Sequence, residues 1–269
     1  MWKWETEQQP RGVIVIVHGA LEHHGRYGWL IEMWRKAGFH VVMGDLPGQG
    51  ITSRAQRGHI STFNDYLTAV KEWVEAAYQF DLPVFLLGHG MGGLISIRLL
   101  QEWDFEVAGV IVSSPYLGMV YTPAKMINMM SHSLNSFAPS FKFSYGVTAD
   151  MLTRNQQVIE ADKEDSLLLN KVSVRWYREL LQAIKVASLK GNEMPDVPLL
   201  VMQAGDDRIV DRKVTRKWFH QMDLSDMHYK EWLGLYHDVF NEPEREDVFH
   251  YAKGFVENQL RLLGYVIDK

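Results

Sequence analysis

The sequence of 269 residues predicts an α/β fold built on a mostly parallel, doubly wound sheet with helices on both faces. Two observations predict this fold. Continuous apolar runs rich in β-branched residues recur along the chain, as strands buried on both faces require. Stretches of helical length lie between these runs, and such alternation is typical of a parallel sheet.

The expected elements follow one another in a regular order. Short apolar runs between turn residues predict strands at Val13–Val17, Val41–Met43, Val84–Leu87, Val107–Val112, Leu199–Met202 and Tyr229–Leu233. Amphipathic stretches predict helices at Tyr66–Tyr78, Gly93–Trp103, Arg212–Met222 and Arg245–Leu263.

One interval breaks the alternation. Between Pro115 and Pro195 the sequence has no run typical of a buried strand, but it has several apolar helical patches and many methionines. We therefore expect a helical cap at 116–194, inserted into a core formed by 1–115 and 195–269. Within the cap, Ser166–Val186 has the periodicity of a pair of amphipathic helices.

Four apolar residues in the first half of the cap are candidate substrate contacts. Methionine and aromatic side chains adapt to irregular apolar ligands such as an acyl chain, although ordinary packing inside the cap explains them equally well. The candidates are Met119, Met126, Met130 and Phe137.

The composition excludes several functions. Charges of both signs are mixed and the net charge is -5, so there is no basic surface for nucleic acid. The absence of cysteine excludes disulfides, a thiolate nucleophile and cysteine-bound metal. The charged N-terminus lacks the apolar segment of a signal peptide, so we expect a cytoplasmic protein. Peripheral contact of the cap with a membrane is an alternative that the sequence does not exclude.

The strongest local motif, Gly88-His89-Gly90-Met91-Gly92-Gly93, lies between an expected strand and an expected helix. Its spacing is that of a nucleophile elbow, in which flanking glycines let a strand turn sharply into a helix and expose the central side chain. The central residue is normally serine, and here it is Gly90. Because glycine has no side chain, this position cannot attack a carbonyl.

The same glycines also match the G-x-G-x-x-G pattern of dinucleotide-binding loops, at Gly88, Gly90 and Gly93. Two observations weigh against this alternative. The match follows the third expected strand instead of the first, and no acidic residue at a strand end follows about 20 residues later to hold a ribose. We therefore expect no cofactor.

Groups suited to acyl transfer follow in chain order. Ala20 lies in the loop after the first strand and Met91 follows the nucleophile position, so their N–H groups are candidate oxyanion donors. Asp206 and Asp207 form an acidic turn after a later strand, and His237 lies on a loop after the last strand. The order of elbow, aspartate and histidine favours a catalytic pair over a structural histidine.

These residues resemble the monoacylglycerol lipase and lysophospholipase branch of the α/β hydrolases. The resemblance runs nearly end to end and includes His18-Gly19-Ala20, Glu22-His23, Gly25-Arg26-Tyr27, Gly44-Asp45-Leu46-Pro47-Gly48-Gln49-Gly50 and Arg57-Gly58-His59. It implies that Asp207, directly before Arg-Ile-Val, is the acid in preference to Asp206. It also implies hydrolysis of a single-chain acyl glycerol or related ester, with the cap forming an apolar tunnel.

The chain departs from this branch at two points. The elbow of the branch is Gly-His-Ser-Met-Gly-Gly, so the difference falls on the attacking residue, Gly90. The N-terminal segment is short for the eight-strand core of these hydrolases, and we expect one or two early strands to be missing.

Three accounts of Gly90 compete: a replacement of serine in an active hydrolase, a naturally inactive relative that binds ligands, and an enzyme of another chemistry. We favour the first, because glycine preserves the strained elbow while removing the hydroxyl. Such a variant should bind a small acyl lipid without turning it over. The presence of both Asp207 and His237 argues against the naturally inactive relative, in which other catalytic residues would also have changed.

The remaining histidines and serines have simpler interpretations. His18, His23 and His24 lie around one turn without carboxylates at metal-site spacing, so we expect no metal. Ser113 and Ser114 end another expected strand, but they lack an elbow and are not proposed as nucleophiles.

Overall fold

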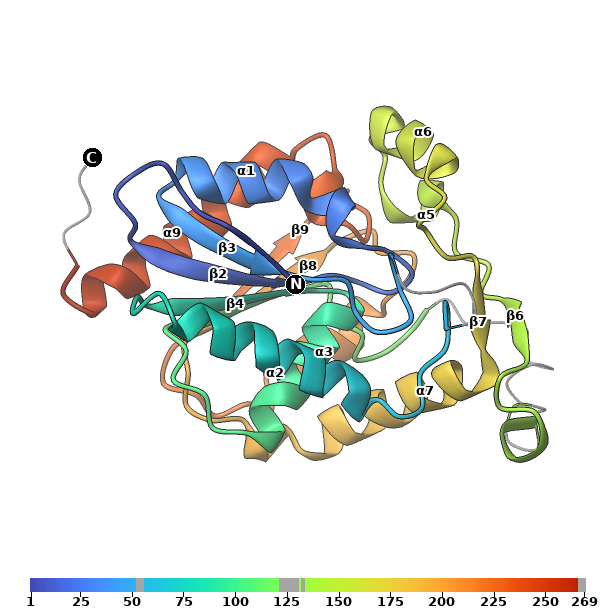
Figure 1. Cartoon of the computed structure of the whole chain (residues 1–269). Coiled ribbons are helices and arrows are strands. Elements are labelled where there is room, and N and C mark those ends of the chain that lie inside the picture. The colour runs from blue at the N-terminus through green and yellow to red at the C-terminus, as the bar shows by residue number, and fades with distance from the viewer. Residues whose placement is uncertain (52–55, 121–130, 132–133, 266–269) are drawn as a thin grey trace.

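The computed structural model describes residues 1–51, 56–120, 131 and 134–265. A seven-stranded sheet in the order β1-β3-β2-β4-β5-β8-β9 forms its centre (Figure 1). Every neighbouring pair in this sheet is parallel except β1 and β3. The strands are β1 Trp2–Trp4, β2 Gly12–Val17, β3 Phe39–Met43, β4 Val84–His89, β5 Gly109–Ser113, β8 Leu199–Ala204 and β9 Met227–Trp232.

Helices cover both faces of the sheet, which confirms the predicted doubly wound α/β fold (Figure 1). Ile14 and Ile16 of β2 belong to the apolar layer that contains residues of α1 and α9, whereas Val13 and Val15 of the same strand belong to the layer that contains residues of α2, α3 and α8. Successive side chains of a strand point to opposite faces, so a strand between two helical layers needs an apolar residue at every position. The helices are α1 Gly28–Lys36, α2 Asn64–Tyr78, α3 Met91–Glu102, α8 Arg212–Phe219 and α9 Arg245–Leu262.

The first strand, β1, had no apolar run to predict it. It has three residues, pairs antiparallel with β3 at the edge of the sheet, and leaves Lys3 exposed. An edge strand is covered on fewer sides, so its sequence needs less apolar character. With β1 included, the described sheet has seven strands, one fewer than the eight of the resembling hydrolases.

The chain between β5 and β8 forms a separate group of elements beside the carboxyl ends of the strands (Figure 1). It contains short helices and a long helix that packs on α3, as well as a small antiparallel sheet that the sequence patterns did not reveal, because its strands have only three residues each. Its described helices and strands include β6 Lys142–Ser144, α5 Ala149–Leu152, α6 Gln156–Glu164, β7 Lys171–Ser173 and α7 Val174–Leu189.

The predicted pair of helices at Ser166–Val186 is wrong, because the structure has a turn, the strand β7 and the single helix α7 there. The side chain of Asp165 accepts the N–H of Leu167 at 2.8 Å and holds the turn. Ser173 then caps α7 by accepting the N–H of Trp176 at 3.1 Å. Helix α6 thus ends before the turn at Asp165, and α7 begins only at Val174.

No helix in the described ranges is both long enough and apolar enough to cross a lipid bilayer.

Candidate active site

Gly90 occupies the sharp turn between β4 and α3, with φ +54° and ψ -114°. This backbone conformation strains any residue that carries a side chain, and it is the conformation of a nucleophile elbow. The turn is held by hydrogen bonds from the Gly90 N–H to the Ser113 carbonyl at 2.8 Å and from the Tyr116 N–H to the Gly90 carbonyl at 3.1 Å. A Cβ atom on Gly92 would overlap the Val17 carbonyl oxygen, so that flanking position requires glycine.

His237 and Asp207 form a buried pair beside this turn. His237 Nδ1 lies 3.0 Å from Oδ2 and 3.1 Å from Oδ1 of Asp207. The carboxylate also accepts the N–H groups of Ile209 and Val210 at 2.9 and 2.8 Å, which fix its orientation. The neighbouring Asp206 has an exposed side chain, so the fold brings Asp207 to the histidine.

The pair perturbs both pKa values in the direction that a general base needs. Burial opposes the charged imidazolium, but the carboxylate of Asp207, with Asp238 and Glu22 further away, raises the pKa of His237 above its usual value. Burial likewise opposes the Asp207 carboxylate, but His237 and two backbone N–H groups lower the pKa of Asp207. The aspartate is therefore ionised at neutral pH and can stabilise a protonated His237.

The other ring nitrogen of His237 faces the elbow. Nε2 lies 3.0 Å from the position of a Cβ atom built on Gly90, and the Tyr116 ring lies 3.3 Å from the same position. A serine at this position would thus have its hydroxyl beside a base that is already oriented by a carboxylate.

The predicted oxyanion donors lie next to the same turn. The Gly19 N–H donates to Glu22, and the Leu21 N–H donates to Gln49 Oε1 at 2.5 Å. Between them, the N–H of Ala20 donates to no acceptor in the described residues, and Ala20 lines the cavity described next. Met91 is the first residue of α3, where a backbone N–H has no partner inside the helix.

A cavity of about 450 Å³ opens above the elbow between the core and the segments that contain α5 and α6. Ala20, His89, Tyr116 and His237 line its floor. Its walls include apolar side chains on both sides, which suit an acyl chain. These are Leu21, Val147, Ala149, Leu152, Leu168 and Leu169.

One end of this cavity contains a buried cluster of charges centred on Arg26. The Arg26 guanidinium donates to both oxygens of Asp162 at 2.9 Å, to Asp238 Oδ2 at 2.9 Å and to Glu22. Burial opposes ionisation of Glu22, yet the charge of Arg26 lowers its pKa to about 2. Three carboxylates therefore surround one guanidinium, and the cluster is acidic overall.

The structure places two of the four predicted cap contacts, Met119 and Phe137, away from this cavity. Met119 packs against the core and bridges to Val210, and the side chain of Phe137 is 89% exposed. Neither lines the cavity. Met126 and Met130 lie outside the described residues.

Ser113 and Ser114 are both fully buried. The Ser113 hydroxyl lies 3.3 Å from His89 Nδ1, and the Ser114 hydroxyl accepts the Ala204 N–H at 3.2 Å. Neither serine lines the cavity, so neither hydroxyl meets a ligand there.

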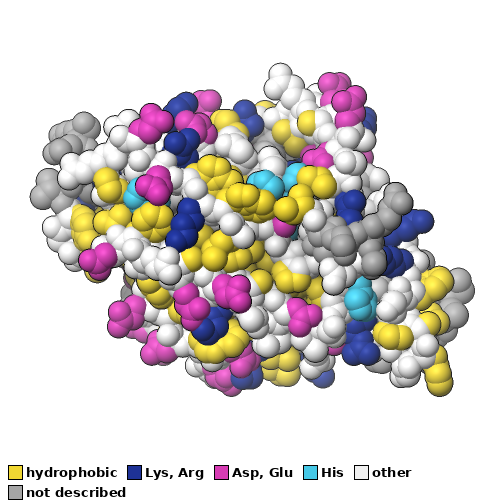
Figure 2. Space-filling model, in the orientation of Figure 1, with side chains coloured by type: hydrophobic (Ala, Val, Ile, Leu, Met, Phe, Trp, Pro, Cys, Tyr) yellow, Lys and Arg dark blue, Asp and Glu magenta, His cyan; other side chains and the backbone are white. Residues whose placement is uncertain are grey.

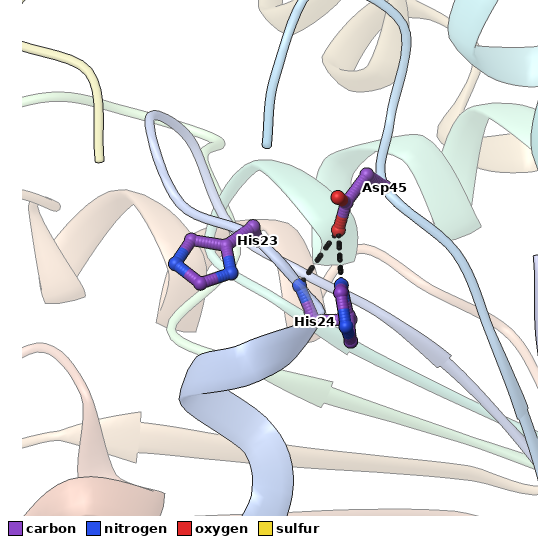
Figure 3. A group of neighbouring side chains, drawn as sticks. All are labelled: His23, His24 and Asp45. Carbon is purple, nitrogen blue, oxygen red and sulfur yellow. Dashed lines mark hydrogen bonds and ion pairs between the residues drawn. The ribbon is translucent and has the colours of Figure 1, made fainter. Parts of the chain in front are cut away.

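Two of the histidines near the first loop form a cluster with Asp45, with candidate ligand atoms within 4.8 Å of one another (Figure 3). The backbone N–H and Nδ1 of His24 both hydrogen-bond to Asp45 Oδ1, at 2.9 and 2.8 Å. His23 Nε2 hydrogen-bonds to Asp165 at 2.7 Å, and its Nδ1 accepts the Gly25 N–H at 3.1 Å. These bonds use both ring nitrogens of His23 and Nδ1 of His24, and they connect loops of the protein. The fold thus brings a carboxylate, Asp45, to two of the histidines, which the spacing in the sequence did not indicate.

Sequence reasoning gave no role to Tyr116 or to the Arg26 cluster. Glu22 and Arg26 belong to the motifs that carry the family resemblance, and Asp238 follows His237 directly. These positions in the sequence could have indicated that the three residues lie near the site. Asp162 had no such indication, because it lies 136 positions from Arg26 and reaches it only through the fold.

Comparison with known proteins agrees with this geometry. The family model described as "Serine aminopeptidase, S33" (Hydrolase_4) matches residues 8–244. A relative named phospholipase YtpA, from Bacillus subtilis, is 54% identical over 97% of this chain and 100% of its own length. The chain belongs to this α/β-hydrolase family. Within it, the relatives that the chain is similar to are named phospholipase and monoacylglycerol lipase.

More distant members of the α/β hydrolases share the whole fold. A monoacylglycerol lipase from Mycolicibacterium smegmatis is 28% identical over 96% of this chain and 92% of its own. The crystal structure of a monoacylglycerol lipase from Paleococcus ferrophilus superimposes with a TM-score of 0.84 at 30% identity, over 97% of each chain. A yeast monoglyceride lipase, at 21% identity and a TM-score of 0.85 over 96% of this chain and 90% of its own, shows the same fold.

Proposed function

We propose that this chain is a lipid ester hydrolase for single-chain acyl lipids in which glycine occupies the nucleophile position. As it stands, it binds monoacylglycerol or a lysophospholipid-like lipid without turning it over. The observation that carries the proposal is the pair of Asp207 and His237, whose free nitrogen Nε2 lies 3.0 Å from a Cβ atom built on Gly90.

The serine form would act in two steps. His237 Nε2 would take the hydroxyl proton as the serine oxygen attacks the ester carbonyl, and Asp207 would stabilise the imidazolium. The N–H groups of Ala20 and Met91 would hold the negative oxygen of the tetrahedral intermediate. The intermediate would then collapse to an acyl-serine ester as the bond to the alcohol breaks and His237 gives that alcohol its proton. Water, deprotonated by His237, would attack this ester, releasing the fatty acid and restoring the serine hydroxyl.

In the glycine form the base, its aspartate and the backbone donors are present, but the attacking oxygen is missing. By analogy with other removals of a triad nucleophile, turnover should fall on the order of a million-fold. Binding should persist, because the cavity walls and the polar groups do not depend on the hydroxyl.

The charge of the Arg26 cluster supports a neutral head group. Its guanidinium already donates to Glu22, Asp162 and Asp238, so a phosphate would meet carboxylates and a cation that is already paired. The hydroxyls of a glycerol can instead donate to these carboxylates. We therefore propose monoacylglycerol as the preferred class, with a single-chain phospholipid as the second candidate because the relative at 54% identity is named a phospholipase.

We also propose that residues 116–194 form a cap over the core of 1–115 and 195–269, and that the cap brings the protein to lipid surfaces. Phe137 and Phe141 are exposed, and Lys142, Lys171 and Arg175 lie on the adjoining elements β6, β7 and α7. Figure 2 shows basic and hydrophobic side chains gathered at this end of the molecule. Such a surface suits peripheral contact with an anionic membrane.

A second candidate function is that of a naturally inactive ligand-binding protein. It is favoured by Gly90 itself, which occupies the strained turn without cost and lets His237 approach closely. The deciding experiment is hydrolysis of monoacylglycerols, lysophospholipids and p-nitrophenyl esters by this chain and by its Gly90→Ser variant, side by side. Turnover by the serine variant alone supports the hydrolase, whereas silence of both across the panel favours the binding protein.

A further inference from the structure

The backbone around Ala20 is held by two side chains, one on each side of the predicted oxyanion donor. The Gly19 N–H, on one side of Ala20, donates to Glu22. The Leu21 N–H, on the other side, donates to Gln49 Oε1 at 2.5 Å. Leu21 has φ +71°, a conformation that residues other than glycine rarely adopt. Such a backbone persists only where its surroundings enforce it, so the partners of Leu21 determine where the Ala20 N–H points.

Gln49 is fully buried and belongs to the loop between β3 and α2. Its carbonyl oxygen accepts the Leu21 N–H, and its Nε2 donates to the Tyr66 hydroxyl at 3.4 Å. A neutral amide is suited to this position because one side chain supplies both an acceptor and a donor.

The hydrogen-bond chain continues into the segment between β5 and β8. The indole Nε1 of Trp176, on α7, donates to the Tyr66 hydroxyl at 2.7 Å, and both side chains are buried. Helix α7 packs on α3, and Trp176 near its start reaches Tyr66 near the start of α2 (Figure 1). The same inserted segment reaches Leu21 directly, because the Leu169 N–H donates to the Leu21 carbonyl at 2.9 Å.

We propose that Gln49 is a positioning residue for the oxyanion hole, and that Tyr66 and Trp176 make its position depend on the docking of α7. Leu21 thus donates one hydrogen bond to Gln49 of the core loop and accepts another from Leu169, and both depend on the inserted segment lying closed against the core. The hole is complete only in that closed arrangement, so substrate enclosure and stabilisation of the oxyanion occur together. This inference rests on the proposed function.

The first test uses the chain as it stands, with hydrogen exchange measured by mass spectrometry on peptides that contain the Leu21 amide. Gln49→Met removes the acceptor at similar size, and exchange should accelerate about tenfold or more because the amide loses its protecting bond. Tyr66→Phe and Trp176→Phe should give smaller accelerations at the same amide. Unchanged exchange in Gln49→Met and Tyr66→Phe would overturn the proposal.

Matched controls separate positioning from general destabilisation. Tyr177 and Trp218 are also buried, but the Tyr177 hydroxyl and the Trp218 Nε1 have no hydrogen-bond partner in the described residues. Tyr177→Phe and Trp218→Phe therefore make the same chemical changes outside the hydrogen-bond chain. Leu21 exchange should stay at its original rate in both, and equal acceleration in these controls would overturn the proposal.

The second test adds Gly90→Ser and measures ester hydrolysis. Gln49→Met should lower kcat about 10- to 100-fold with KM within about twofold, since a misplaced donor weakens the transition state and leaves ground-state binding intact. Tyr66→Phe should lower kcat less and Tyr177→Phe not at all. A matching rise in KM with no loss of kcat would overturn the inference. If Gly90→Ser itself is silent, the proposed function fails, while the exchange experiment still decides the role of Gln49.

Discussion

His237 Nε2 lies 3.0 Å from the point where a Cβ atom on Gly90 would stand. This is closer than most Cβ contacts in proteins, so a serine would require the imidazole to shift by a few tenths of an ångström. A small retreat of the ring would leave the serine hydroxyl within hydrogen-bond reach of Nε2.

Gly90→Ser should therefore gain esterase activity while losing stability. A side chain at φ +54° and ψ -114° should cost about 1–3 kcal/mol of unfolding free energy. Gly90→Ala is the matched control, because it adds the same strain without a hydroxyl. Urea unfolding should show similar losses for both variants, and monoacylglycerol hydrolysis should appear only with serine. Activity in the alanine variant would contradict the assignment of the nucleophile.

Asp207→Asn, made together with Gly90→Ser, should lower kcat by about 10⁴-fold. The amide neither stabilises the imidazolium nor holds the neutral imidazole in the tautomer that accepts the proton. Asp206→Asn is the neighbouring control and should leave kcat unchanged, since its side chain is exposed. Steady-state kinetics on one monoacylglycerol compares the two. Equal effects at both positions would place the acid elsewhere.

The serine form should show a rate that rises with pH. His237 must be neutral to accept the proton, and its pKa lies above the usual 6.5 because nearby carboxylates favour the charged ring. The value of kcat/KM should thus fall as pH drops through this raised pKa. Asp238→Asn removes one of these carboxylates and should move the midpoint of the pH profile to lower pH. A midpoint that stays fixed or moves upward would contradict this electrostatic account.

The glycine form should bind neutral single-chain lipids in preference to anionic ones. A monoacylglycerol should raise the melting temperature of the unmodified chain, whereas a single-chain lipid with a terminal phosphate of the same acyl length should raise it less. The reason is the excess of carboxylates around Arg26. Asp162→Asn removes one negative charge and should reduce the difference in melting temperature between the two lipid complexes. Equal stabilisation by both lipids would argue against selection by charge.

Arg26→Met should destabilise the protein strongly, by about 3–5 kcal/mol, because it leaves three buried carboxylates without their cation. Arg212, whose partner is Glu231 at the surface, provides the comparison. Arg212→Met should cost less than about 1 kcal/mol, since exposed ion pairs contribute little. Chemical denaturation measures both, and a small loss at Arg26 would mean that the cluster rearranges.

The sequence by itself determined the α/β fold, the elbow at Gly90 and the order in which Asp207 and His237 follow it. These features are local: periodic apolar runs define buried strands, and a few adjacent residues define a turn or a strand end. Residues on the short elements β1, β6 and β7 had no comparable pattern, because three residues are too few to show a period.

Only the tertiary structure decided which distant residues meet. The contact of Asp162 with Arg26 spans 136 positions, and the hydrogen-bond chain from Trp176 through Tyr66 and Gln49 to Leu21 joins four separate segments. The approach of His237 to Gly90 likewise depends on how the loop after β9 packs on the elbow. Such distances arise from the packing of segments far apart in the chain. The order of the motifs predicted that His237 belongs with the elbow, but no local pattern gives the distances between them.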